Sequence, residues 1–129
     1  MESLYDYGAR AGFWRLHRLF TRKQIPCTVY AVGMALERNP DVCRAMTLAG
    51  WEVASHGYRW VDYQNVDEEL ERAHIKKTVK IHETMVGTRP VGMYQGKVRR
   101  RNVANFQTYH SSRKLEVIMI SSLSTAAKY

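Results

Sequence analysis

Cysteine and long apolar runs are scarce in this chain of 129 residues. The only two thiols, Cys27 and Cys43, lack the CxxC spacing, so the sequence indicates neither a disulfide framework nor a zinc knuckle, and we expect both as small buried residues. No stretch reaches the roughly 18 consecutive apolar residues of a membrane span. Residues 1–10 contain acids and aromatics where a secretory signal carries an apolar core. We therefore expect a soluble, cytoplasmic protein without a membrane partner.

Acidic residues are scarce only near the C-terminus. Residues 1–96 contain 13 Lys and Arg against 11 Asp and Glu, whereas residues 97–129 contain 7 against 1, so most of the net charge of +8 belongs to the tail. No aromatic platform or recognition helix accompanies the basic run at residues 97–101, which argues for a solvated tail and against a nucleic-acid partner. A non-catalytic interaction protein that uses this basic tail is kept as the alternative function.

Hydrophobic periodicity predicts helices that alternate with short strands. Apolar residues at three- and four-residue steps indicate an amphipathic helix over residues 8–24, which Pro26 ends. The β-branched run of residues 27–32 predicts a buried strand that Gly33 closes. We expect a second helix over residues 40–49, capped by Asn39 and ended by Gly50.

A second buried strand is predicted over residues 51–55, with Ser55-His56-Gly57 at its C-terminal end. The longest helix is predicted over residues 65–86, where Asn65 and Glu68 have capping-box spacing. An apolar stripe through Ile75, Val79, His82 and Val86 is predicted on this helix. A third short strand is expected over residues 91–94. This order predicts the α/β class with parallel strands and helical crossovers.

Three segments resemble the polysaccharide deacetylase superfamily, and within it the deacetylase-type allantoinases. They are Glu2-Ser-Leu-Tyr-Asp-Tyr-Gly-Ala-Arg-Ala-Gly-Phe-Trp-Arg-Leu16, then Gly50-Trp-Glu-Val-Ala-Ser-His-Gly-Tyr-Arg-Trp-Val-Asp-Tyr63, then Gly87-Thr-Arg-Pro-Val-Gly-Met-Tyr-Gln-Gly96. The resemblance indicates a partial deacetylase-like domain over residues 1–97 and a divergent basic tail over residues 98–129. We expect that tail to derive from a frameshift, a retained intron or a truncated duplicate.

The resemblance implies a distorted (β/α) barrel and hydrolysis of a carbon–nitrogen bond in a small amide or ureide. In the metal-dependent members, two histidines at i and i+4 and an aspartate hold a metal that activates water. Here the pair would be His56 and residue 60, which is Trp60, and an indole does not ligate a metal. We therefore expect neither a metal nor another cofactor, and treat a zinc-dependent deacetylase as the second interpretation within the family.

His56 is the candidate catalytic residue that the resemblance implies, through hydrogen bonding to substrate or proton transfer. The candidate substrate-binding residues are Glu2, Tyr5, Arg10, Arg59, Trp60 and Tyr94. The family's first-strand acid and its late catalytic histidine have no counterpart in this sequence. We therefore expect weak or absent activity from the chain alone.

The other polar residues have simpler interpretations. His56 itself is alternatively a structural histidine at a strand end. His17, His74 and His82 are expected at the surface or the edge of the core, and Glu68, Glu69 and Glu71 on a solvated helix face. The sequence leaves open the substrate and whether the chain forms homo-oligomers, which three strands with exposed edges would favour.

Overall fold

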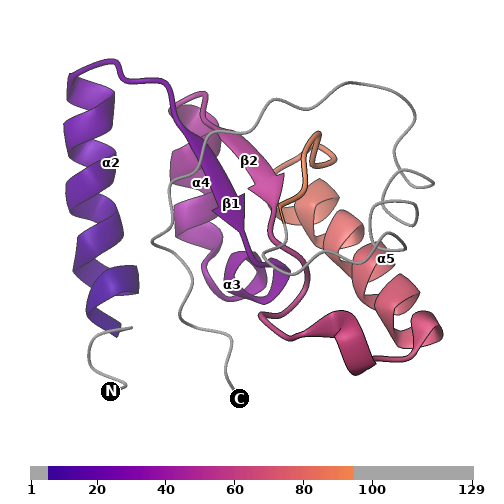
Figure 1. Cartoon of the computed structure of the whole chain (residues 1–129). Coiled ribbons are helices and arrows are strands. Elements are labelled where there is room, and N and C mark those ends of the chain that lie inside the picture. Colours follow the sequence, from indigo (N-terminus) through magenta and orange to yellow (C-terminus); the bar gives the residue numbers. More distant parts are fainter. Residues whose placement is uncertain (1–5, 95–129) are drawn as a thin grey trace.

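The computed structural model describes residues 6–94, and the predicted sites and elements beyond them lie outside this range. Helices and two strands alternate along the chain (Figure 1). In order, the elements are η1 (Gly8–Gly12), α2 (Phe13–Arg22), β1 (Thr28–Ala31), α3 (Gly33–Arg38), α4 (Pro40–Leu48), β2 (Glu52–Ser55), η2 (Tyr63–Asn65) and α5 (Glu68–Met85). The predicted α/β class is confirmed. Within residues 6–94, no helix is both long and apolar enough to cross a membrane.

The two strands are parallel and form the centre of the described fold. Val29 is paired with Val53, and Ala31 with Ser55. Every residue of β2 after Glu52 is buried, whereas partly buried and buried residues alternate along β1. The predicted third strand is reduced to a single parallel bridge between Ser55 and Met93. It is nevertheless placed on the far side of β2 from β1, so the predicted parallel arrangement holds.

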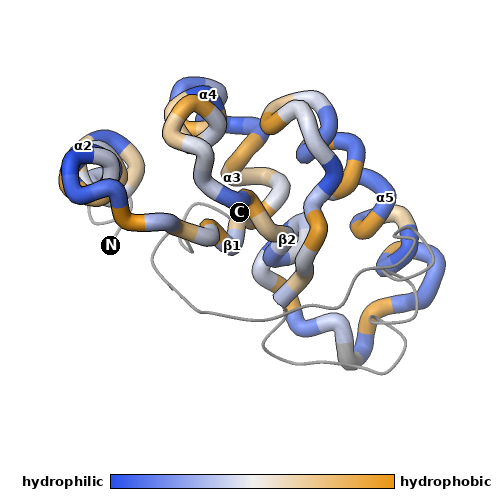
Figure 2. The backbone as a smooth tube through the Cα atoms, turned by 90° about the horizontal axis from the view of Figure 1, so that it is seen from above, coloured by the Kyte–Doolittle hydropathy of each residue, from blue (hydrophilic) through white to orange (hydrophobic). Residues whose placement is uncertain are grey.

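Helices cover the strands on one face and at both sides. Figures 1 and 2 show α4 behind the strands, α2 beyond β1 and α5 beyond β2. The core lies between the strands and these helices, with Met46 and Cys43 almost fully buried. Its buried apolar members are Phe13, Val29, Ala31, Leu36, Cys43, Ala45, Met46, Val53, Ile81 and Val86. The expectation that Cys43 is buried is confirmed, whereas Cys27 is only partly buried.

The first predicted helix forms, but a π-helical stretch over Gly8–Gly12 follows the α-helical residues Asp6 and Tyr7. η1 carries Arg10, and the α-helical part then runs to Arg22. The chain leaves the helix through Gln24, which has a positive φ of 53°, two residues before Pro26. His17 joins this helix to α4, because its Nε2 lies 3.2 Å from the carbonyl oxygen of Ala45.

A short helix, α3, follows β1 where no helix was predicted. Gly33 does end the strand, but it also begins this helix, and its amide donates to the carbonyl of Gly57 at 2.9 Å. A side chain at residue 33 would approach the Tyr58 ring at 3.4 Å and the Thr78 hydroxyl at 3.5 Å. Glycine therefore allows α3, α5 and the loop after β2 to pack closely.

Asn39 does not cap α4 as predicted. Its side-chain amide donates instead to the carbonyl of Ala35, at 2.8 Å. At the other end, Gly50 has a φ of +69° and donates to the carbonyl of Thr47, while Trp51 donates to that of Met46. These two bonds form a Schellman motif, so the predicted role of Gly50 is confirmed.

The longest helix begins later than predicted and has a different cap. Asp67, not Asn65, is the N-cap of α5, and its carboxylate accepts from the amide of Glu69 at 3.0 Å. The predicted stripe of Ile75, Val79, His82 and Val86 is buried throughout. Glu71 was expected on a solvated face and is only 2% exposed, and His82 was expected at the surface or core edge and is fully buried.

Candidate functional site

The backbone after β2 places His56 at the carboxyl end of the two strands. Its amide donates to the carbonyl of Ala31 at 2.8 Å, which continues the parallel ladder by one residue. Gly57 then turns the chain with a φ of +80°, a conformation that glycine adopts without steric cost. The amide of Gly57 also donates to the hydroxyl oxygen of Ser55, at 3.2 Å. The sequence Ser55-His56-Gly57 therefore ends the strand and places one partly exposed imidazole at its carboxyl end.

The ring of His56 is oriented by Tyr94. Nδ1 lies 2.7 Å from the backbone carbonyl oxygen of Tyr94. Because a carbonyl oxygen only accepts, Nδ1 carries the proton, and in the neutral ring Nε2 carries the lone pair. The two rings are stacked, with centroids 5.6 Å apart and planes 17° apart. Tyr94 thus fixes both the tautomer and the plane of His56, while the imidazole is only partly buried.

Aromatic side chains surround the imidazole. The Trp60 ring lies 6.4 Å from that of His56 and is 52% exposed. The Tyr30 ring, on β1, lies 5.7 Å from that of Tyr94. Flat rings beside a hydrogen-bonding imidazole are a surface on which a small planar molecule can stack.

Arg59 lies next to Trp60 in the loop after β2 and is partly buried. Its Nε lies 3.0 Å from the sulfur of Met34 on α3, so its stem is held against that helix. Together, His56, Arg59, Trp60 and Tyr94 are four of the predicted site residues that the structure places around the end of β2.

The remaining predicted site residues are placed differently. Arg10 is exposed on η1, at the end of the molecule toward which the strands point (Figure 1). No contact joins it to His56, Trp60 or Tyr94 in the described part of the chain. Glu2 and Tyr5 lie outside the described residues.

Behind the site, a buried tyrosine and a histidine join the loop to α5. The hydroxyl of Tyr63 lies 2.9 Å from Nδ1 of His74. Burial, followed by the negative charge of Glu71, raises the pKa of Tyr63 to about 12. Burial, followed by the positive charges of Arg59 and Lys77, lowers the pKa of His74. No sequence pattern indicates a functional role for these two residues, because their proximity depends on how the loop packs.

The donors near His56 do not fit a metal ion. Among residues 6–94, no three His, Cys, Asp or Glu side chains gather closely enough to hold one. The i+4 position beside His56 is the indole of Trp60, which supplies no lone pair for a metal. Burial raises the pKa of both Cys27 and Cys43, so neither thiol is an activated ligand or nucleophile.

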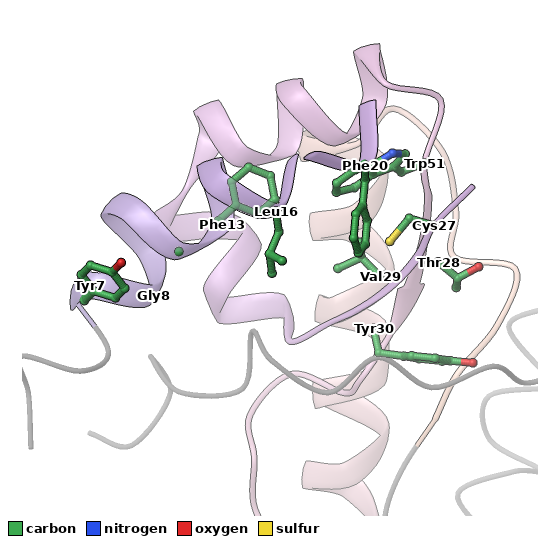
Figure 3. A pocket seen from close by; sticks show the side chains of 11 residues that line it. Tyr7, Gly8, Phe13, Leu16, Phe20, Cys27, Thr28, Val29, Tyr30 and Trp51 are labelled. Atoms are coloured by element: carbon green, nitrogen blue, oxygen red, sulfur yellow. The ribbon is translucent and has the colours of Figure 1, made fainter. Parts of the chain in front are cut away.

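An apolar groove of about 230 Å³ lies between α2 and β1 (Figure 3), and Tyr30, whose ring lies 5.7 Å from that of Tyr94, is one of its lining residues. Phe13, Leu16 and Phe20 reach it from the helix and Val29 from the strand. Among residues 6–94, its lining is Tyr7, Gly8, Gly12, Phe13, Leu16, Phe20, Cys27, Thr28, Val29, Tyr30 and Trp51. The predicted site residues within this range do not line it.

Comparison with protein families gives one consistent match. The model described as "Polysaccharide deacetylase" matches residues 2–102. A curated relative, "Putative polysaccharide deacetylase" of Schizosaccharomyces pombe, is 49% identical over 80 residues, which are 62% of this chain and 25% of that protein. The chain therefore spans about a quarter of the length of this relative.

Two solved structures agree with this match. One, "Crystal structure of Puue Allantoinase", is 48% identical with a TM-score of 0.79, and the match covers 84% of this chain and 36% of that one. The other, a "probable Polysaccharide deacetylase from Pseudomonas aeruginosa PAO1", is 50% identical with the same TM-score of 0.79 and the same coverage. The α/β arrangement thus matches about a third of each of these structures.

Proposed function

The chain belongs to the polysaccharide deacetylase family, and we propose that it carries the His56 part of a site that hydrolyses a carbon–nitrogen bond in a small amide or ureide. The observation that supports this most is the imidazole of His56 at the end of β2, held by the Tyr94 carbonyl at 2.7 Å. Nε2 faces away from that bond and is free of hydrogen bonds to the described residues. It is therefore the atom that would meet a substrate.

The chemistry follows from the protonation of this ring. With Nδ1 donating to Tyr94, Nε2 accepts a hydrogen bond from a substrate N–H or takes a proton during the reaction. Trp60 would stack on a planar ureide, and Arg59 would supply donors to its carbonyl oxygens. Tyr94 holds His56, and Arg10, Glu2 and Tyr5 complete the proposed set of substrate-binding residues.

An allantoin-like ureide is the favoured substrate over an N-acetyl sugar. The 48% identity to an allantoinase structure supports it, as does the indole of Trp60 at the i+4 position from His56. The 50% identity to a probable polysaccharide deacetylase supports the second candidate, deacetylation of an amino sugar. That reaction in its metal-dependent form needs a second nitrogen ligand, where this chain has Trp60.

The larger fold is proposed to be a distorted (β/α) barrel, of which the described strands form an arc. Parallel strands with chemistry at their carboxyl ends are typical of such barrels. Two strands and a bridge do not close a barrel, and the chain spans 36% of the allantoinase structure. We therefore propose that the 129-residue chain assayed alone is weakly active or inactive.

Turnover assays of the purified 129-residue chain test this proposal. We expect neither opening of allantoin nor release of acetate from acetylated amino-sugar oligomers, with a full-length allantoinase as the positive control for the first assay. Elemental analysis is expected to find no stoichiometric zinc. If the chain opens allantoin and the His56→Ala variant does not, the expected inactivity of the chain is contradicted, whereas the proposed role of His56 in the site is supported. Stoichiometric zinc together with deacetylation would establish the second candidate instead.

A further inference from the structure

Ser55, the last residue of β2, is only 1% exposed, and its polar atoms bond in two directions. Its amide donates to the carbonyl of Gly92 at 2.7 Å, and its carbonyl accepts from the amide of Tyr94 at 2.9 Å. Its hydroxyl oxygen accepts from the amide of Gly57 at 3.2 Å. The backbone of Ser55 therefore holds the segment that carries Tyr94, while its side chain holds the turn after His56.

The hydroxyl bond encloses His56 in a short turn. A serine hydroxyl that accepts from the amide two residues later forms an ST-turn, which restricts the backbone of the residue between them. That residue is His56, whose own amide donates to the carbonyl of Ala31 at 2.8 Å. The carbonyl of Gly57 accepts in turn from the amide of Gly33 at 2.9 Å. Both backbone groups of Gly57 are thus held, so the backbone of His56 is fixed on its two sides.

A second path of hydrogen bonds joins Ser55 to the imidazole itself. The amide of Tyr94 donates to the carbonyl of Ser55, and the carbonyl oxygen of Tyr94 lies 2.7 Å from Nδ1 of His56. Ser55 therefore places the acceptor through its backbone and the ring through its hydroxyl. The backbone bonds are available to any residue at position 55 except proline, whereas the bond to Gly57 needs the side chain. A substitution here consequently isolates the contribution of the hydroxyl.

We propose that Ser55 is a positioning residue for His56, because its hydroxyl fixes the turn that carries the imidazole and so keeps Nδ1 within reach of the Tyr94 carbonyl. Ser55 itself does not touch the proposed substrate. The purpose of this role rests on the proposed function, in which Nε2 of His56 meets the substrate. The role can nevertheless be tested without any substrate, through the tautomer of His56.

Nitrogen-15 NMR of the folded 129-residue chain at alkaline pH, where histidine rings are neutral, tests the proposal. In the unmodified chain, His56 is expected as the Nδ1–H tautomer. Ser55→Ala removes the hydroxyl, and we expect the ratio of Nδ1–H to Nε2–H rings at His56 to fall roughly two- to tenfold, the range that one lost hydrogen bond produces. The protection of the Gly57 amide against hydrogen exchange is expected to fall by a similar factor.

Two further variants separate positioning from packing. Thr78→Val removes another buried hydroxyl, which lies on α5 and donates to the carbonyl of His74 at 2.8 Å. It is expected to change neither the tautomer of His56 nor the protection of Gly57. Ser55→Thr retains the hydroxyl and is expected to keep both close to those of the unmodified chain.

The unmodified chain decides the question if Ser55→Ala does not fold. Among residues 6–94, no backbone carbonyl accepts from the Gly57 amide, so its protection depends on the Ser55 hydroxyl. Exchange of Gly57 as fast as in an unstructured peptide would overturn the proposal, as would an Nε2–H tautomer at His56.

Among the folded variants, three results would also overturn the proposal. They are an unchanged tautomer ratio in Ser55→Ala, an equal change in Thr78→Val, and a loss in Ser55→Thr as large as that in Ser55→Ala. None of these results depends on turnover or ligand binding. The role of Ser55 can therefore be established in a chain that neither binds nor hydrolyses a ureide, and in that case the proposed function alone would fail.

Discussion

At the scale of single residues, the site depends on which partner each ring nitrogen of His56 has. A histidine at a strand end becomes a usable acceptor only when its other nitrogen is engaged, and here the Tyr94 carbonyl engages it at 2.7 Å. Residues 56 and 94 are distant in sequence, and the bridge between Ser55 and Met93 brings them together. The sequence predicted both residues as members of the site. It did not predict the bond between them, because that bond involves a backbone carbonyl that no side-chain pattern reveals. Similarly, Glu71 was expected on a solvated helix face and is 2% exposed, and the contact of 2.9 Å between Tyr63 and His74 was not predicted.

The lowered pKa of His74 predicts a pH dependence of stability at this same scale. The folded state holds this ring neutral, whereas the unfolded chain protonates it near 6.5, so below that pH the unfolded state binds more protons. The contribution of the neutral His74 ring to folding stability is present above pH 6.5 and is lost as the pH falls through the pKa of His74 in the folded state. Denaturant unfolding at pH 7 and pH 5 is expected to show a smaller loss of stability in His74→Phe than in the unmodified chain. Equal losses would contradict the assignment.

At the scale of elements, hydrophobic period predicted the type and the buried face of the long helices, and missed their exact ends. The buried stripe of α5 was predicted because four apolar or aromatic positions recur at helical spacing. Its cap was not, because Glu68 follows Asn65 at capping-box spacing whereas Leu70 stands at that spacing after Asp67, so the pattern indicated the wrong residue. α3 was missed because six residues are too short for a helical period, and its stability comes from packing against α5.

The cap of α5 can be tested by a matched pair. Asp67→Ala removes the carboxylate that accepts from the Glu69 amide, so we expect a loss of about 0.5–2 kcal/mol in the free energy of unfolding. Asn65→Ala is the control and is expected to change it by no more than about 0.5 kcal/mol. Urea denaturation of the three proteins measures both. A larger loss of unfolding free energy in Asn65→Ala than in Asp67→Ala would show that Asn65 is the N-cap, as the sequence predicted.

The end of α4 gives a second prediction at the element scale. Gly50 has a φ of +69° with no neighbouring atom within 4 Å of an added Cβ, so the cost of Gly50→Ala is conformational only. A left-handed alanine costs about 1–2 kcal/mol. Gly8 has equally open space but lies in helical backbone, so Gly8→Ala is expected to be neutral or slightly stabilising. Thermal unfolding of the two variants is the measurement, and an equal effect of both would contradict the Schellman motif.

At the scale of the whole molecule, the parallel α/β arrangement could be predicted because helices alternated with short apolar strands, and β1 and β2 do pair in parallel. The number of strands could not, because residues 91–94 end as one bridge and the apolar pattern does not distinguish a bridge from a strand. The groove between α2 and β1 was not anticipated at all. Leu16 and Phe20 of α2 line it together with Val29 of β1. The formation of homo-oligomers through exposed strand edges stays a prediction.

Binding of a ureide next to His56 is tested most directly by an NMR titration of the labelled 129-residue chain with allantoin. We expect the imidazole signals of His56 and the indole N–H signal of Trp60 to shift together and saturably, while the indole N–H signals of Trp14 and Trp51 do not shift. His56→Ala should abolish the shift at Trp60. A dissociation constant of about 1 mM corresponds to about 4 kcal/mol of binding free energy. If no signal shifts at allantoin concentrations above this value, binding at His56 is contradicted. A shift confined to Trp51, beside the groove, would also contradict it.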